Sequence, residues 1–481
     1  MPGSILPNPT FRLQPAAEQL ALQTNYITNF DFLNQYLPDT YEKEFERYGN
    51  RTIASFLRLV GAEMPSNSDQ IKWAEQGRLH IKYTTCTASA VSTTVATFTI
   101  SDTGATSAAI RIGQTLFIQV NGGATAGLSY KAIVTAVTGL VVTVAFYQIN
   151  TGVGTSIVNG DICTVFIYGS EFRKGTTGMI GSLDAEDEIF SNKPIILKDR
   201  YAVNGSDMAQ IGWVEVTTEN GATGYLWYLK SEHETRLRFE DYLETAMIET
   251  VPAATGSGAA AVLGGAGQGG SEGIFFVVNS RGNVWGGGTP TSLADWDSIV
   301  QRLDKQGAIE ENVIFCNRQL SFDIDGMLAG LNGASTVTGA PSYGASYGLF
   351  DNDVTMALNL GFSGFRRGYD FYKSDWKYLN DPTMRGGLST AATASGTVTG
   401  LLVPAGSTSV YDQIMGKNAK RPFLHVRYRA TESEDRRYKT WITGSAGGAA
   451  TSDLDAMEVN FLSERCVCTL GANNFVLFRY G

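Results

Sequence analysis

The sequence predicts an α+β protein built from several parts, with an all-β module in its first half and one long helix near its middle. Short alternating runs of Val, Thr and Ile recur through residues 88–169, which is typical of antiparallel strands. Residues 224–250 hold a single helical pattern that ends at Val251-Pro252, because proline lacks an N–H and clashes with the preceding turn. Residues 291–480 alternate between helical and strand-like segments.

Composition argues against several classes of protein. The chain has 481 residues and a formal net charge of −10, whereas general nucleic-acid binders usually present a basic face. Its five cysteines are odd in number and scattered, which indicates folding in a reducing environment. The first residues lack the basic and apolar regions of a signal peptide. No apolar run approaches the roughly 18 residues needed to span a bilayer, so we expect no membrane association.

Residues 1–65 are expected to form an arm rather than a domain. Prolines near the start favour an extended chain, and residues 42–59 have the pattern of one amphipathic helix or two short ones. The many aromatic residues argue against a disordered tail. Such a segment adds little to a core of its own, so we expect it to lie on a neighbouring protein.

Residues 88–169 are predicted to form a small antiparallel β-barrel or sandwich. Asn159-Gly160 is a strong hairpin signal within it. The segments on either side, 71–85 and 192–205, are both extended and charged. The simplest interpretation is a long hairpin loop that carries the β-module as an insertion.

The predicted helix 224–250 has one apolar stripe, formed by residues with i, i+3, i+4 spacing. These residues are Phe239, Tyr242, Leu243, Ala246 and Met247. Charged side chains occupy the rest of its surface. At about 1.5 Å per residue the helix would be roughly 40 Å long, which suggests a strut between two unlike regions.

The mixed region begins with a helix capped by Thr291 or Ser292 and ending at Gly307. The other elements expected there are strands at 274–278, 312–317 and 399–407, a helix at 321–333, a hairpin of 422–430 with 436–443, and a packed C-terminal segment at 459–481.

No catalytic constellation is recognisable, so we expect no enzyme activity and no cofactor. The isolated histidines, His80, His233 and His425, are interpreted as surface or interface residues. The GxGxxG match at 265–270 follows a helix end and precedes an expected strand, the reverse of a dinucleotide site. A flexible surface loop is the favoured interpretation.

We also expect no metal site. Cys466 and Cys468 would lie on one face of a strand, and core packing is favoured over zinc. Asp323 and Asp325 resemble the start of a calcium loop, but the remaining ligands are missing. The acidic run at 184–188 is either a metal site or, as we favour, a solvated turn.

Two basic segments, Arg366-Arg367 and 417–421, could contact phosphates. Interface salt bridges are the favoured interpretation.

Three segments resemble parts of major capsid proteins of podovirus-like phages, in particular the crAss-like group. They are YDFYKSDWKYLNDPTMRG (369–386), LLVPAGSTSVYD (401–412) and LSERCVCTLGANNFVLF (462–478). The order of parts across nearly the whole chain resembles the Hong Kong 97 type major capsid protein of tailed bacteriophages (Caudoviricetes).

This resemblance implies a division into named parts. They are an N-terminal arm (1–65), an extended E-loop (66–87 and 170–220), an inserted β-barrel or sandwich module (88–169), the spine helix of the P domain (221–252), an A domain with Gly-rich loops (253–420) and P-domain return strands (421–481).

The resemblance also implies a structural role. The protein would self-assemble into hexamers and pentamers that form the icosahedral shell around a double-stranded DNA genome. Its partners would be further copies of itself, the portal vertex, decoration or auxiliary proteins and, weakly at the inner surface, packaged DNA. It would reside in the virion capsid after assembly in the host bacterial cytoplasm.

Within that interpretation, the proposed core of the spine helix is Phe239, Leu243 and Met247. The proposed inter-subunit contacts are Arg236, Arg238, Arg366 and Arg367.

Two alternatives stay open. The β-rich region 88–169 would also suit another virion structural protein, such as a tail or adhesin component. A hydrolase with a β-sandwich accessory module would require a convergent polar site, which the sequence does not reveal.

Overall fold

The computed structural model describes residues 63–123, 125–152, 156–181, 187–209, 216–217, 223–224, 227–263, 269–307, 309–333, 363–388, 394–412, 417–447 and 450–481. The expected arm up to residue 62, most of the acidic run and most of the GxGxxG segment lie outside these ranges. The chain divides into two compact units. One contains Asp199–Phe239 and Thr440–Phe461, and the other contains the barrel and the larger mixed sheet.

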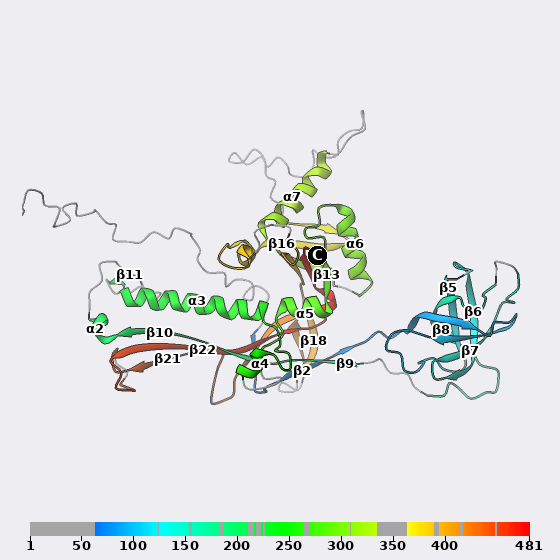
Figure 1. The fold of residues 1–481 in the computed structure, drawn as a ribbon, viewed down its shortest axis with the longest axis horizontal. Helices are drawn as coiled ribbons and strands as arrows, with labels where there is room; N and C mark the ends of the chain where they lie inside the picture. The colour runs from blue at the N-terminus through cyan, green and yellow to red at the C-terminus, as the bar shows by residue number, and fades with distance from the viewer. Residues whose placement is uncertain are drawn as a thin grey trace, which may run out of the picture. The chain divides into compact units, whose positions relative to one another are not determined.

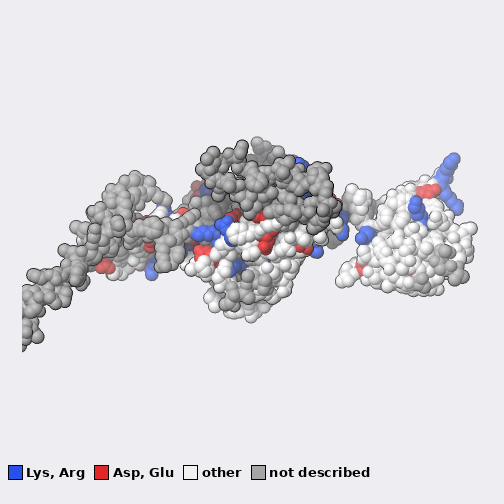
Figure 2. All heavy atoms as spheres, turned by 90° about the horizontal axis from the view of Figure 1, so that it is seen from above, with Lys and Arg blue, Asp and Glu red and all other residues white. Residues whose placement is uncertain are grey.

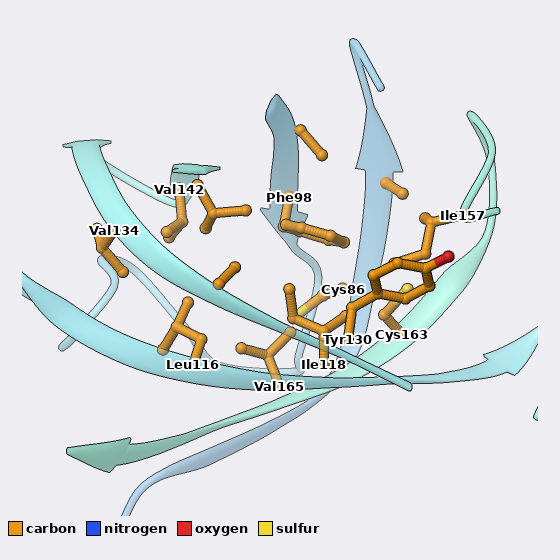
Figure 3. Close-up of a cluster of buried hydrophobic side chains, with 14 of the residues drawn as sticks. Cys86, Phe98, Leu116, Ile118, Tyr130, Val134, Val142, Ile157, Cys163 and Val165 are labelled. Atoms are coloured by element: carbon orange, nitrogen blue, oxygen red, sulfur yellow. The ribbon is translucent and has the colours of Figure 1, made fainter. Parts of the chain in front are cut away.

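The β-rich module is a closed six-stranded barrel with the order β3-β4-β7-β6-β5-β8. Its strands are β3 (Lys82–Ser89), β4 (Val95–Ile100), β5 (Gln114–Gly122), β6 (Ser129–Thr138), β7 (Val141–Phe146) and β8 (Ile162–Ser170). Alternate residues point inward and form one apolar core, which includes Phe98, Leu116, Ile118 and Val165 (Figure 3). This alternation follows from the two-residue period of a strand.

The barrel begins earlier than the sequence indicated. Residues 82–87, expected in the extended loop, belong to β3 because Cys86 lies opposite Cys163 of β8 inside the barrel. Before and after the barrel in the chain come β2 (Ile71–Gln76) and β9 (Asp187–Asn192). These two strands form a separate antiparallel ribbon, with Gln76 paired to Asp187.

A five-stranded sheet contains the longest strand of the described chain. Its order is β1 (Glu63–Ser66), β20 (Leu424–Arg429), β22 (Ala456–Thr469) and β10 (Ile195–Asn204), with β21 (Lys439–Gly444) also paired to β22. The expected hairpin of 422–430 with 436–443 is therefore wrong. Both strands pair with β22, because its long apolar run offers partners along its whole length.

A second, six-stranded sheet has the order β13-β23-β17-β14-β16-β15. Its strands are β13 (Asn283–Trp285), β23 (Val476–Arg479), β17 (Val398–Pro404), β14 (Glu311–Cys316), β16 (Tyr369–Asp375) and β15 (Gly364–Arg367). The last strand, β23, thus lies in this sheet and not with the other strands of 421–481. Its continuous apolar run suits a strand buried on both faces, and it pairs in parallel with β13.

Helices cover both faces of the six-stranded sheet (Figure 1). Consecutive residues of β14 point to opposite faces of the sheet. Ile314 packs with helices α6 (Leu293–Asp304) and α7 (Arg318–Gly333), whereas Phe315 packs with α5 (Ile274–Arg281). The expected strand at 274–278 is therefore wrong. A short apolar run has no decisive period, and burial of Ile274, Phe275 and Val278 fits one face of a helix.

Two expected helices are confirmed. Ser292 caps α6 and forms a reciprocal capping box with Asp295, and α7 covers the predicted 321–333. The long helix, α3, runs from Trp227 to Glu249, slightly shorter than expected, because Gly224 belongs to the short strand β12 (Thr223–Gly224) that pairs with β11 (Val216–Thr217).

The remaining elements are short. They are α2 (Gly205–Met208), α4 (Gly258–Val262), α8 (Lys377–Asn380), the 3-10 turns η5 (Arg385–Gly387) and η6 (Ala472–Asn474), and the hairpin of β18 (Ser407–Asp412) with β19 (Lys417–Pro422), which contains the basic segment 417–421. Within the described ranges, no helix has the length and apolar composition to cross a bilayer.

Candidate interaction surfaces

The β2–β9 ribbon has two unlike faces. In β2, Ile71, Trp73 and Glu75 are half-buried, while the residues between them are exposed. Trp73 lies across from Phe190 of β9, with ring centroids 6.4 Å apart. One face of the ribbon therefore rests on the protein, and the opposite face is open to solvent.

Asn192, the last residue of β9, fixes the root of the ribbon. Its buried side-chain amide donates to the carbonyl oxygens of Glu272 (2.9 Å) and Val467 (2.6 Å). Its side-chain oxygen accepts from the Ser271 hydroxyl and the Glu272 N–H, each at 2.9 Å. One side chain thus joins the ribbon to β22 and to the loop before α5.

Two further contacts hold the half-buried face. The carboxylate of Glu75 accepts from the Gly471 N–H at 2.9 Å and from the Trp73 indole N–H at 3.0 Å. The Arg281 guanidinium lies 4.2 Å from the Phe190 ring centroid and pairs with Glu272 at 2.9 Å. A cation over an aromatic face contributes roughly 0.5–2 kcal/mol, depending on solvent exposure.

Large apolar side chains remain exposed on the ribbon and its connections to the barrel. Relative exposure is 68% for Ile189 on β9, 77% for Leu79 after β2 and 84% for Ile180 before β9. Single exposed apolar residues are common. Contiguous apolar patches, in contrast, often mark sites of association, so these three side chains are the candidates for a contact here.

Helix α3 buries Phe239, Leu243 and Met247, the three residues proposed for its core. Phe239 contacts the ring of Phe461 with centroids 5.7 Å apart. Met247 lies in the apolar core that α5 shares with the six-stranded sheet. The predicted stripe is wrong at Tyr242, which is largely exposed.

The charged surface of α3 is also less uniform than expected, since Asp241 and Glu244 are buried. At the C-terminal end, Glu249 accepts from the Tyr378 hydroxyl at 2.7 Å and pairs with Arg385 at 2.5 Å. Burial and the bond to Glu249 raise the pKa of Tyr378 well above its usual range. These contacts fix the end of the helix just before Pro252.

The four arginines proposed for inter-subunit contacts all have neighbours within the chain. Arg238 lies 3.6 Å from Asp199, Arg366 pairs with Asp370 at 3.0 Å, and Arg367 forms two bonds with Asp297 at 2.7 and 2.8 Å. The Arg236 guanidinium lies 3.1 Å from His233. The side chains of Arg238, Arg366 and Arg367 remain largely solvent-accessible.

The other sequence candidates occupy structural positions. Cys466 and Cys468 are buried on β22, beside His425 of β20. The hydrogen bond from Cys466 lowers the pKa of the Cys468 thiol, with a further contribution from His425, and the same bond raises that of Cys466. Asp325 lies in α7 and pairs with Lys373 at 2.6 Å, so it does not begin a calcium loop.

Among the residues that the structure describes, no three side chains capable of binding a metal ion come together. The contacts that sequence reasoning missed are those of Asn192 and Arg281. Neither residue belongs to a motif. Apart from Glu272, which pairs with Arg281, the partners described above lie far away in the sequence, so no local signal identified them.

Comparisons with known proteins give matches in solved structures only. No family model matches the chain, and no curated protein does. Similar structures include one titled Microbacterium phage Oxtober96, with 11% identity over 95% of this chain and 100% of that one at a TM-score of 0.38. The mature capsid of bacteriophage PhiM1 is 7% identical over 92% and 91% of the two chains, also at 0.38. The cyanophage Pam1 capsid is 12% identical over 65% and 82%, at 0.36.

Proposed function

We propose that this chain is the major capsid protein of a tailed bacteriophage, with a Hong Kong 97 type fold. It self-assembles into hexamers and pentamers that form an icosahedral shell around a double-stranded DNA genome. The observation that supports this best is the β2–β9 ribbon, fixed at its root by Asn192 and bearing exposed apolar side chains on and beside it. Neighbouring copies would cover those side chains, since closed shells depend on repeated contacts between identical subunits.

The order of elements supports the same proposal. In it, the arm is 1–65, the E-loop is the ribbon with its connections, the barrel is an insertion in that loop, and α3 is the spine of the P domain. The P domain contains the five-stranded sheet and the A domain contains the six-stranded sheet. Two boundaries change in this proposal. The inserted barrel begins at Lys82, the first residue of β3, and no longer after residue 87. Strand β23, within 421–481, is assigned to the A domain and not to the P domain.

Partners follow from this role. The chain would contact further copies of itself, the portal vertex, decoration or auxiliary proteins and, weakly, packaged DNA. It would reside in the virion capsid after assembly in the cytoplasm of the host bacterium. The sequence resemblance favours a podovirus-like or crAss-like phage.

The test of the ribbon is substitution of its exposed apolar residues. The double variant Ile180→Asp, Ile189→Asp should fold with an unchanged unfolding free energy, within about 0.5 kcal/mol, because both side chains are exposed. Electron microscopy should show shells or capsomers for the unaltered chain and none for the variant. The control, Ile180→Val with Ile189→Val, keeps the apolar surface and should assemble.

Other outcomes have defined meanings. An unaltered chain that stays monomeric under all assembly conditions contradicts the capsid proposal. Shells formed by the aspartate variant contradict the role of the ribbon. Trimers or stacked rings would favour a tail or adhesin component.

A second test separates folding from assembly along α3. Leu243→Gly should impair both, because it removes a buried side chain and introduces a poor helix former. Arg236→Glu and Arg238→Glu should impair assembly more than folding, with the clearer separation at Arg238, because its side chain is exposed and that of Arg236 is half-buried. Assembly that survives both reversals would remove these arginines from the interface, and Arg238→Lys is the matched control.

A further inference from the structure

The outward face of three neighbouring barrel strands, β6, β5 and β8, has an unusual composition. Phe117 of β5 and Phe166 of β8 lie opposite each other with stacked rings, 5.2 Å between centroids and 28° between planes. Tyr168 follows on β8, and its relative exposure is 48% against 39% for Phe166. We call these three residues the aromatic platform.

The platform is outside the barrel by the geometry of the strands. Leu116 and Ile118 on either side of Phe117 are fully buried in the core, as is Val165 beside Phe166. Because side chains alternate between faces, the intervening rings must point outward. They therefore make no contribution to the barrel core and are free to contact another molecule.

This face carries almost no charge. Across the described strands β6, β5 and β8, Lys131 is the one charged side chain, and its ammonium lies 5.9 Å from the ring centroid of Tyr168. Glu171 follows β8, and the Tyr147 hydroxyl donates a hydrogen bond to its carboxylate. Figure 2 shows the barrel as a mainly uncharged surface, with a few charged groups.

Amide and hydroxyl groups lie beside the rings. In the strand register, Gln119 is next to Thr164 on one side and Ser129 on the other. The Asn121 amide donates to the Thr164 hydroxyl. These groups can each donate or accept hydrogen bonds, so the face combines flat apolar rings with uncharged polar groups.

We propose that the aromatic platform and the adjacent amides and hydroxyls form a binding site for a neutral polysaccharide. A sugar ring has apolar C–H faces that suit the platform and hydroxyl groups that suit Gln119, Asn121 and Thr164. In another small barrel, the five-stranded OB-fold, one outer face of the strands binds oligosaccharides or oligonucleotides. Single-stranded nucleic acid requires a groove lined by several cations. The three strands themselves supply only Lys131. Arg173 and Lys174 lie beyond the end of β8, away from the paired rings in the strand order.

This binding site is additional to the proposed capsid role, and all of its residues lie in the barrel. Isothermal titration calorimetry of the full chain with dextran, laminarin and mannan, three uncharged polysaccharides, tests it directly. Binding of at least one is expected. Tyr168→Ala and Phe166→Ala should each weaken that binding about tenfold, the equivalent of one lost ring contact.

Matched variants separate the platform from the fold. Tyr168→Phe keeps the ring and should retain most of the affinity. Phe166→Leu keeps apolar volume without an aromatic face and should lose affinity as Phe166→Ala does. It therefore tests the ring even if the alanine variant folds poorly. Val95→Ala removes an exposed apolar group from β4, on which no platform residue lies, and should bind like the unaltered chain.

Several results would overturn the proposal. Absence of binding to all three polysaccharides is one, and equal binding by Tyr168→Ala is another. Binding of a 20-mer oligothymidylate in their place would assign the face to nucleic acid. Loss of shell assembly in Tyr168→Ala, without any polysaccharide binding by the unaltered chain, would assign it to a second copy. Shell formation itself is scored separately by electron microscopy, so failure of either proposal is recognisable alone.

Discussion

The barrel and the β2–β9 ribbon are both antiparallel, yet their strands are stabilised in different ways. Each barrel strand has a hydrogen-bonded neighbour on both sides, and its inward side chains share one apolar core. In the ribbon, each strand pairs only with the other among the described residues, and Asn192 is its one fully buried side chain there. A two-stranded ribbon without further packing is marginal in water.

The barrel and the ribbon are therefore stabilised by different interactions. Burial of apolar area stabilises the barrel from within, at about 25 cal/mol per Å². The ribbon depends on a few polar contacts at its root, which fix its position but leave one face uncovered. A closed element can therefore fold as a unit, whereas an open one needs packing from outside its own strands.

The largest expected effect is in the barrel core. Phe98→Ala should lower the unfolding free energy of the barrel by about 3–5 kcal/mol, because it leaves a cavity among fully buried side chains. Hydrogen–deuterium exchange should show faster exchange throughout β4 and β7 and no change in β2. Val95→Ala, exposed on the same strand, should cost below about 0.5 kcal/mol. Faster exchange confined to residues next to Phe98 would contradict a single cooperative barrel.

The reciprocal change is at the ribbon root. Asn192→Ala removes the side-chain partner of five backbone and side-chain groups, and each buried group left without a hydrogen bond costs about 1–3 kcal/mol. Exchange should accelerate in β2 and β9 while the barrel stays protected. Asn192→Asp keeps the acceptor but puts a buried carboxylate oxygen against the carbonyl oxygens of Glu272 and Val467, so it should destabilise the root at least as much as Asn192→Ala. Protection of β9 that stays equal to that of the unaltered chain in both variants would show that the root does not depend on this residue.

Alkaline pH should affect the barrel and not the ribbon. Burial raises the pKa of the Cys86 and Cys163 thiols from 9.0 to about 12. The folded state therefore favours the neutral thiol, and this stabilisation is complete below pH 9 and lost as pH rises towards 12. By pH 10 the loss is on the order of 1 kcal/mol for each thiol.

Alkylation by iodoacetamide, followed by mass spectrometry, measures this pH dependence. Protection of Cys86 should fall between pH 8 and pH 10, and Cys163→Ala should reduce the dependence by about half. Hydrogen exchange in the described ribbon, which contains no cysteine, should show no corresponding loss of structure once the intrinsic effect of pH is removed. Unchanged protection at pH 10 would contradict a barrel that opens with its thiols.

The smallest expected effect is at Glu75. Glu75→Gln keeps a side-chain oxygen that can accept from the Gly471 N–H, and removes only the charge. The loss should be below about 1 kcal/mol, seen as slightly faster exchange at Gly471. Glu75→Leu removes the acceptor as well and should exceed it. An equal effect of both variants would mean that packing, and not this hydrogen bond, holds the face.

The elements predicted well are those with a local physical signal. Alternation of Ala96, Phe98 and Ile100 with polar residues identified a barrel strand. Thr291 or Ser292 marked the start of α6, and Ser292 is the cap in the structure. The segment 274–281 gave no such signal, since Gly273 at its start offers no side-chain cap. Its helical state depends on packing in the core beside Met247 and Trp376, which a local pattern does not encode.

The same reasoning explains the candidate surfaces. Three core positions on α3 followed from helical spacing, whereas exposed Tyr242 and buried Glu244 depend on which neighbours pack against each side. Asn192 bonds to Val467, 275 positions away. Contacts of that kind arise only when segments far apart in the sequence pack together, here the ribbon and strand β22 of the five-stranded sheet.

The pairing of Gln76 with Asp187 bears on how the barrel could have been gained in evolution. The chain leaves the ribbon and returns to it at adjacent points, roughly 5 Å apart in an antiparallel pair. A domain inserted there places no demand on the distance between the two ribbon strands. The barrel is therefore an inserted domain that evolution could exchange for another. A two-residue turn could also replace it without displacing Asn192 or the two larger sheets.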